Sequence, residues 1–170
     1  MFSIASLKTF ADNARAADRR VVFTNGVFDL LHPGHIRYLE AARALGDVLV
    51  VGLNSDRSVR ENKGPSRPIT PEAERAEILS ALACVDAVAI FDEPTPAEII
   101  RAVAPHVLVK GADWAEDAIV GRDTVEARGG VVIRIPIEKG WSTSAIIERI
   151  KHLGPPVAGV TPGTTARPES

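Results

Sequence analysis

Short runs of consecutive apolar residues alternate along the chain with longer segments in which apolar residues recur at helical spacing. The runs are rich in Val, Ile and Leu, as is typical of strands covered on both faces. They occupy residues 21–23, 48–53, 87–91, 107–109 and 131–135. The other segments predict helices at 34–45, 71–83, 96–103 and 143–152, and an extra helix within the first twenty residues. This alternation predicts an α/β fold: a doubly wound, parallel, five-stranded sheet with helices on both faces.

The ends of the predicted elements carry their own signals. In the helix at 34–45 the apolar residues fall on one stripe, and Gly46 follows as a candidate C-cap. Thr95-Pro96-Ala97-Glu98 is typical of a capping box with proline at the first helical position. After residue 153 the composition changes to Pro, Gly, Thr and Ala. We therefore predict a single domain at 1–153 and a disordered tail at 154–170.

Composition excludes several classes of function. The chain has 170 residues and a net charge of -2, so it offers no general attraction to nucleic acid or to an anionic membrane, and we expect neither as a partner. Its single cysteine, Cys84, cannot form an internal disulfide, and a metal site built on sulfur is excluded. The N-terminus lacks the apolar segment of a signal peptide, and no run approaches the ~18 apolar residues of a membrane span. We therefore expect a cytoplasmic protein.

One segment between the first strand and the next helix carries the candidate chemistry. Neither the G-x-G-x-x-G nor the G-x-x-x-x-G-K-[ST] phosphate fingerprint occurs in the chain. Ligands of open α/β sheets nevertheless sit at the carboxyl ends of strands, where the next helix presents free N–H groups. His32 and His35 are three residues apart, so we expect both rings on one side of the helix, with Pro33 at its first position. The segment reads Thr24-Asn25-Gly26-Val27-Phe28-Asp29-Leu30-Leu31-His32-Pro33-Gly34-His35.

The histidine pair alone has other interpretations. A histidine at a helix start is often a cap or a surface residue, and two histidines at this spacing can bind a metal. The complete segment, however, resembles the signature of the nucleotidyltransferase superfamily that includes the cytidylyltransferases and pantetheine-phosphate adenylyltransferase. In that superfamily the H-x-G-H histidines bind the triphosphate and stabilise the transition state. The resemblance implies a Rossmann-like nucleotidyltransferase fold, with His32 and His35 as catalytic residues.

The same resemblance implies binding roles for the neighbouring residues. Asp29 becomes a candidate substrate ligand. Gly34 has no side chain, so a phosphate can approach the backbone closely there. The implied nucleotide contacts come from Asn25, Gly26, Val27, Phe28 and Gly34.

A second element, Gly140-Trp141-Ser142-Thr143-Ser144, precedes the last predicted helix. By itself it is a good N-cap. Hydroxyls and free amides at a helix N-terminus also suit phosphate oxygens, and the superfamily carries a G-x-S-T-[ST] motif here that holds the nucleotide phosphates. The resemblance therefore implies that Ser142, Thr143 and Ser144 bind the nucleotide.

Further cations follow the second strand. Lys63, Arg67 and Arg75 lie on a polar stretch that could fold over the site, although each one alone is more often a solvated surface charge. In the superfamily a lysine after the second strand binds the acceptor phosphate and the transition state, and an arginine of the following helix supports the nucleotide site. These roles map to Lys63 and Arg75, and Arg67 is a candidate substrate ligand.

The loop after the fourth strand belongs at the same edge of the sheet. There Lys110 and Gly111 are candidates for nucleotide contacts, and Asp113 for a contact with the substrate. Trp114 is equally well explained as a packing residue.

This residue set favours direct displacement. It contains no nucleophile with a paired base, which argues against a covalent route. A phosphate monoester acceptor needs none, because it is already largely dianionic at neutral pH. We expect His32 and His35 to stabilise the α-phosphate in the transition state, Lys63 to neutralise the acceptor, and Mg²⁺ to be held by the triphosphate rather than by side chains.

The acceptor is indicated by resemblance alone. Over residues 20 to 150 the chain resembles the adenylyltransferase domain of bacterial heptose biosynthesis, which joins D-glycero-β-D-manno-heptose 1-phosphate to AMP from ATP. The shared text includes the histidine segment, Lys63-Gly64-Pro65-Ser66-Arg67-Pro68, Leu108-Val109-Lys110-Gly111-Ala112-Asp113-Trp114 and G-W-S-T-S. No kinase-sized segment is present, so the resemblance implies the stand-alone form, supplied by a separate sugar kinase. Family members are often dimeric or larger, and we expect a homo-oligomer.

Two alternatives stay open. Glycerol-3-phosphate cytidylyltransferase has a similar loop and closing motif, but it carries an arginine where this chain has Ile137. That difference does not decide between ATP and CTP, because backbone groups recognise much of the nucleotide base in such folds. A non-catalytic nucleotide sensor would be expected to lack a histidine or the lysine, and neither is missing.

Overall fold

The computed structural model describes residues 2–112, 115, 118–136 and 140–153. The predictions for Asp113, Trp114, Ile137 and the tail at 154–170 fall outside these residues. Within them the sheet consists of β1 (Val21–Gly26), β2 (Val48–Asn54), β3 (Ala87–Phe91), β4 (Val107–Gly111) and β5 (Val131–Ile135). All pairings are parallel and the order is β3-β2-β1-β4-β5. The predicted five-stranded parallel sheet is confirmed.

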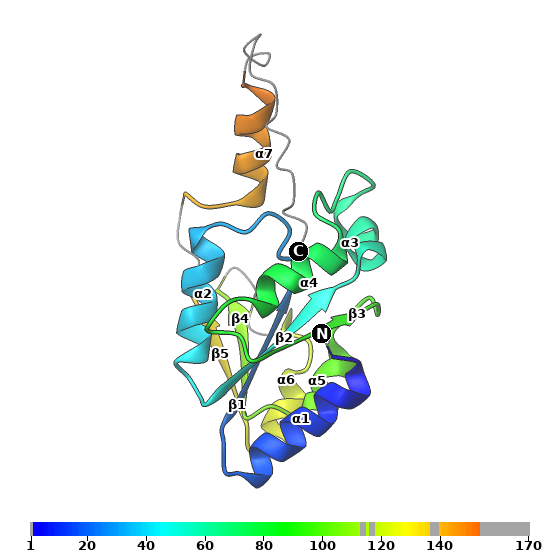
Figure 1. Ribbon diagram of the computed structural model, residues 1–170. Helices are drawn as coiled ribbons and strands as arrows, with labels where there is room; N and C mark the ends of the chain where they lie inside the picture. Colours follow the sequence, from blue (N-terminus) through cyan, green and yellow to red (C-terminus); the bar gives the residue numbers. More distant parts are fainter. Residues whose placement is uncertain (1, 113–114, 116–117, 137–139, 154–170) are drawn as a thin grey trace, which may run out of the picture.

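Helices cover both faces of the sheet, as predicted (Figure 1). One hydrophobic cluster joins the sheet to α1 (Ile4–Ala16), α5 (Ala97–Val103) and α6 (Arg122–Glu126). A second cluster joins the opposite face to α2 (Pro33–Arg43) and α4 (Glu72–Ser80). The last helix is α7 (Thr143–Lys151), and none of its residues is buried. Within the described residues, the helices are all too short or too polar to cross a membrane.

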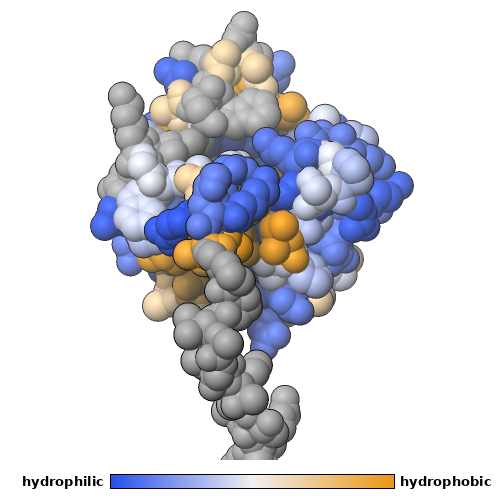
Figure 2. Space-filling model, turned by 90° about the horizontal axis from the view of Figure 1, so that it is seen from above, coloured by the Kyte–Doolittle hydropathy of each residue, from blue (hydrophilic) through white to orange (hydrophobic). Residues whose placement is uncertain are grey.

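The direction of winding reverses between β1 and β4. From β1 the chain proceeds outward through β2 to β3, and it then returns through α5 to β4 on the other side of β1. Such a reversal leaves a crevice at the carboxyl ends of the two central strands, where ligands bind in open α/β sheets. Seen from above, this end of the molecule is largely hydrophilic, with hydrophobic residues gathered near its middle (Figure 2).

Two helices were not predicted. The first, α3 (Asp56–Lys63), is almost entirely polar and carries one buried apolar residue, Val59. It forms because Ser55 caps its N-terminus, with Ser55 Oγ accepting from the amide of Ser58 at 3.1 Å. The second, α6, has only five residues. Hydrophobic periodicity cannot detect such elements.

Three local expectations were wrong. The C-cap of α2 is Ala44 rather than Gly46; glycine is required at 46 because a Cβ there would lie 2.7 Å from the carbonyl oxygen of Arg20. The helix after Thr95 begins at Ala97, with Pro96 as the N-cap and no side-chain capping bond. The edge strand β5 is not covered on both faces, since Val131 is 41% exposed. The helices predicted at 34–45 and 71–83 also end two and three residues earlier.

Candidate active site

The loop that leaves β1 is shaped by Gly26 and Phe28. Phe28 has a φ of 45°, a left-handed conformation that costs a residue with a side chain about 1 kcal/mol or more. Its ring folds back over Gly26, where a Cβ would lie 3.0 Å from Phe28 Cε2. The pair therefore explains the glycine of the G-V-F-D string, and it places the buried Phe28 ring beside the start of α2.

The two histidines lie at the N-terminus of α2, with their rings stacked. His32 is the N-cap and Pro33 begins the helix. The ring centroids of His32 and His35 are 3.8 Å apart and the planes differ by 15°. Phe28 packs edge-on against His35 at 5.4 Å, and Trp141 lies beyond His32 at 6.4 Å. The expectation that both rings lie on one side of the helix is confirmed.

Burial sets the charge of this pair. It lowers the pKa of His32, and it lowers the pKa of His35 from 6.5 to about 4, with a smaller contribution from the charge of His32. Both rings are therefore mostly neutral at pH 7. Among the described residues the buried Nδ1 atoms of His32 and His35 have no hydrogen-bond partner. A buried polar atom left in this way costs about 1–3 kcal/mol and needs an explanation beyond folding.

The N-terminus of α7 meets the N-terminus of α2. Thr143 Oγ1 donates to the carbonyl of Leu30 at 3.3 Å. A Cβ on Gly34 would lie 3.0 Å from Trp141 Cβ and 3.1 Å from His32 Nδ1, so any side chain there would crowd the contact between the two helices. Ser142 is the predicted N-cap, its Oγ accepting from the amide of Ala145 at 3.0 Å, and Ser144 is exposed. Two positive helix ends thus converge, which favours a polyanion.

Lys110 brings a cation to the same edge of the sheet. Its side chain is buried at the end of β4 and Nζ donates to Asn25 Oδ1 at the end of β1. Burial lowers the pKa of Lys110 to about 8. Because β1 and β4 flank the reversal of winding, this pair lies where a ligand is expected, with Gly111 next to it.

Asp29 holds the loop that follows α3. Its buried carboxylate accepts from Arg67 Nε at 2.6 Å and from the amides of Ile69 and Thr70 at 2.9 Å. Burial alone would raise the pKa of Asp29, but the two amides and the guanidinium hold it below its usual value. Asp29 and Arg67 therefore bind each other in this structure. Lys63, which ends α3 just before the loop, is exposed.

Arg75 is completely buried, and its guanidinium bonds to groups from three segments of the chain. Its guanidinium donates to the carbonyl of Val27 at 2.5 Å, to the carbonyl of Thr70 at 2.9 Å and to Asp56 Oδ1 at 2.7 Å. It joins the β1–α2 loop, the loop after α3 and the start of α3. Arg75 thus ties together the segments on which the candidate site is built.

Sequence reasoning missed two groups that complete this framework. Asp56 is the charge partner of Arg75. Thr24 is buried in β1, where Oγ1 lies 2.7 Å from Tyr38 Oη of α2 and donates to the carbonyl of Val109 in β4 at 3.1 Å. A threonine in an apolar strand is a weak signal, because threonine is common in strands. In the described part of the chain, no group of three or more His, Cys, Asp or Glu side chains is arranged to hold a metal ion.

The buried histidine makes stability depend on pH. In the unfolded chain His35 binds a proton below about pH 6.5, whereas in the folded chain it does so only near pH 4. Protonation therefore favours the unfolded chain between these values. We expect the free energy of unfolding to fall by up to about 3 kcal/mol from pH 6.5 to pH 4, at about 1.4 kcal/mol per pKa unit. Urea titrations across this range measure it.

His35→Asn provides the control for this titration. Asparagine cannot be protonated here, so the slope between pH 6.5 and 4 should become shallower than that of the wild-type chain. Equal slopes for the two chains would show that His35 is not the group responsible.

Comparison with known proteins agrees with this geometry. The model of the family described as cytidylyltransferase-like matches residues 23–149. The bifunctional protein HldE of Syntrophotalea carbinolica is 54% identical over 145 residues, which cover 85% of this chain and 30% of that protein. HldE of Hyphomonas neptunium is 58% identical over 135 residues, 79% of this chain and 28% of that protein. The chain thus spans about 30% of the length of these relatives.

Solved structures share the fold. A lipopolysaccharide core biosynthesis protein from Thermoplasma volcanium has a TM-score of 0.60 and 32% identity, covering 71% of this chain and 98% of its own. A protein of unknown function from Archaeoglobus fulgidus has a TM-score of 0.54 and 23% identity, covering 73% of this chain and 93% of its own, which supports the fold alone.

Proposed function

The chain belongs to the cytidylyltransferase-like family, and we propose that it transfers AMP from ATP to a sugar 1-phosphate, releasing pyrophosphate. The proposed acceptor is D-glycero-β-D-manno-heptose 1-phosphate, and the product is then ADP-heptose. The observation that carries the proposal is the stacked pair of His32 and His35 between two converging helix N-termini. The acceptor is supported by the high identity to HldE proteins and by the likeness to a lipopolysaccharide core biosynthesis protein.

The reaction needs only donors and cations from the protein. An oxygen of the acceptor phosphate forms a bond to the α-phosphorus of ATP, and the bond from that phosphorus to the bridging oxygen of the β-phosphate breaks. Pyrophosphate leaves with that electron pair. His32 and His35 donate to the α-phosphate oxygens, while the amides at the N-terminus of α7 hold the β and γ phosphates. Mg²⁺ enters with ATP as part of the substrate and neutralises charge on the triphosphate.

The remaining charged residues position the two substrates. Lys63 neutralises the acceptor phosphate, and Lys110 adds positive charge at the end of β4. Arg75 and Asp29 keep the surrounding loops in place through the bonds described above. In this proposal the domain acts in the cytoplasm as a homo-oligomer, on a sugar 1-phosphate that a kinase has made.

A second candidate is transfer of CMP to glycerol 3-phosphate or a related acceptor, favoured by the cytidylyltransferase-like match. One assay separates the two: pyrophosphate release with ATP or CTP, each against heptose 1-phosphate and glycerol 3-phosphate. We expect release with ATP and heptose 1-phosphate to exceed the other three pairs. Preference for CTP with glycerol 3-phosphate would select the second candidate, and no release with any pair would contradict both.

A further inference from the structure

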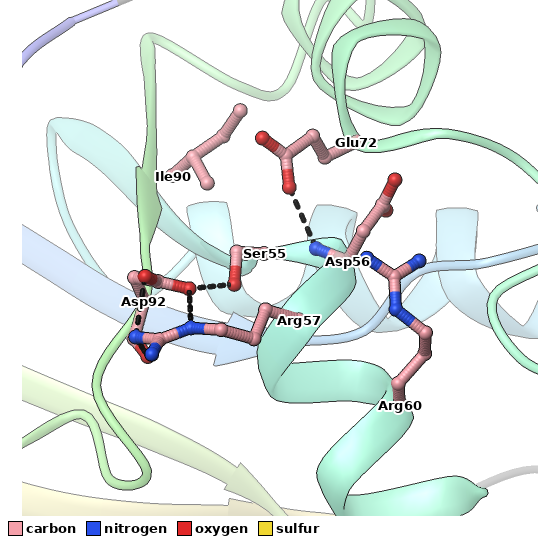
Figure 3. A pocket seen from close by; sticks show the side chains of 7 residues that line it. All are labelled: Ser55, Asp56, Arg57, Arg60, Glu72, Ile90 and Asp92. Atoms are coloured by element: carbon pink, nitrogen blue, oxygen red, sulfur yellow. Dashed lines mark hydrogen bonds and ion pairs between the residues drawn. The ribbon is translucent and has the colours of Figure 1, made fainter. Parts of the chain in front are cut away.

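A cavity of about 540 Å³ lies at the carboxyl ends of β2 and β3 (Figure 3), and neither His32 nor His35 is among its lining residues. Its size is within the range of small-molecule sites. Its walls come from the start of α3, the first residue of α4 and the end of β3. Charged side chains dominate the lining: Asp56, Arg57, Arg60, Glu72 and Asp92.

Most of these groups are already bonded to each other. Asp92 pairs with Arg57 at 2.5 Å and accepts from Ser55 Oγ. Glu72 uses Oε2 to accept from the amide of Asp56 at 2.6 Å. Arg60 is different: its guanidinium has no hydrogen bond or ion pair with any described residue. Hydrogen bonds and ion pairs therefore hold most of the lining side chains in place, and Arg60 is the lining cation that bonds to no described residue (Figure 3).

Arg60 also lies on the helix that carries Lys63, the proposed ligand of the acceptor phosphate. Arg60 and Lys63 are three residues apart on α3, so they share one face of the helix. Asp56, another lining residue, is bonded to Arg75, which in turn donates to Val27 in the loop before the histidines. The cavity is thus joined to the β1–α2 loop through a buried side chain, and it opens beside the helix that carries the proposed acceptor-phosphate ligand.

We propose that this cavity is the subsite for the hydroxyl-bearing ring of the acceptor, and that Arg60 is its specificity-determining residue. The inference rests on the proposed function. A sugar ring presents hydroxyl groups that both donate and accept, and the cavity offers a free guanidinium next to carboxylates that can accept. A smaller acceptor without a ring would reach Lys63 but leave this cavity unfilled.

The test is Arg60→Met, which keeps the length of the side chain and removes its donors. Heptose 1-phosphate should bind more weakly, with its KM raised on the order of tenfold or more, because a hydrogen bond to a charged group is lost. The KM for ATP should be unchanged, and the melting temperature should match that of the wild-type chain. Arg101→Met is the matched control, since Arg101 is an exposed arginine on α5 at the opposite face. It should change neither KM.

Calorimetry gives a readout that does not depend on turnover. Titration of heptose 1-phosphate into each protein should show weaker binding to the Arg60→Met variant than to wild type or Arg101→Met. An unchanged acceptor affinity in an active enzyme would overturn the subsite and leave the proposed function standing. A rise of the ATP KM equal to that of the acceptor would also overturn it. A wild-type chain that releases no pyrophosphate with any sugar 1-phosphate would overturn both.

Discussion

Replacing His35 with alanine is expected to lower kcat by about two to three orders of magnitude, the usual cost of removing one donor to a transition-state oxyanion. The ring is partly buried and stacked on His32, and its Nδ1 has no hydrogen-bond partner among the described residues. In the proposed reaction the ring of His35 donates to a phosphate oxygen. Because the lost donor acts mainly in the transition state, the KM for ATP should change far less than kcat.

Steady-state pyrophosphate release measures this effect, and His152→Ala is its control. His152 follows the last helical turn of α7 and is exposed, so its removal should leave kcat within about twofold of wild type, as expected for a surface substitution. The His35→Ala variant should also remain folded near pH 5, where the wild-type imidazole is a burden on stability. Full turnover by a folded His35→Ala variant would remove the histidines from the mechanism.

Much of the fold could be predicted because each strand is a run of consecutive apolar residues. Val48 to Leu53 is fully buried, and such a run of apolar residues is typical of a strand covered on both faces. The helix α3 could not be predicted in this way, because its stability comes from the cap at Ser55 and from the pairing of Asp56 with Arg75. Gly46 shows a related limit: its role depends on the closeness of Arg20, which is distant in sequence.

In the candidate site, too, local sequence predicts some features, whereas others depend on contacts between distant residues. That the rings of His32 and His35 lie on one side of α2 follows from their spacing of three residues, so the local sequence was sufficient. Asp29 and Arg67 were predicted as substrate ligands, but their bond to each other spans 38 residues and depends on how the loop after α3 folds. The free guanidinium of Arg60 could not be recognised either, since many exposed arginines look alike in sequence.

Arg75 looks like a solvated surface charge in the sequence, but in the structure its side chain is completely buried. Arg75→Met is expected to lower the free energy of unfolding by about 3–5 kcal/mol, the typical cost of breaking a buried pair. The substitution leaves the Asp56 carboxylate and the carbonyls of Val27 and Thr70 without their donor. For a domain of this size the melting temperature should fall by roughly 10 °C. Urea denaturation measures the change.

Two companion variants separate the contributions of charge and geometry. Arg75→Lys keeps the charge, but an ammonium cannot reproduce a planar fork that reaches three acceptors in different segments, so its loss should be intermediate. Arg101→Met removes an exposed arginine and should change stability by less than about 0.5 kcal/mol. Val27 belongs to the loop that places the histidines. Arg75→Lys should therefore also reduce kcat under conditions in which the variant remains folded. If Arg75→Met costs less than about 1 kcal/mol, the guanidinium does not hold these three segments together.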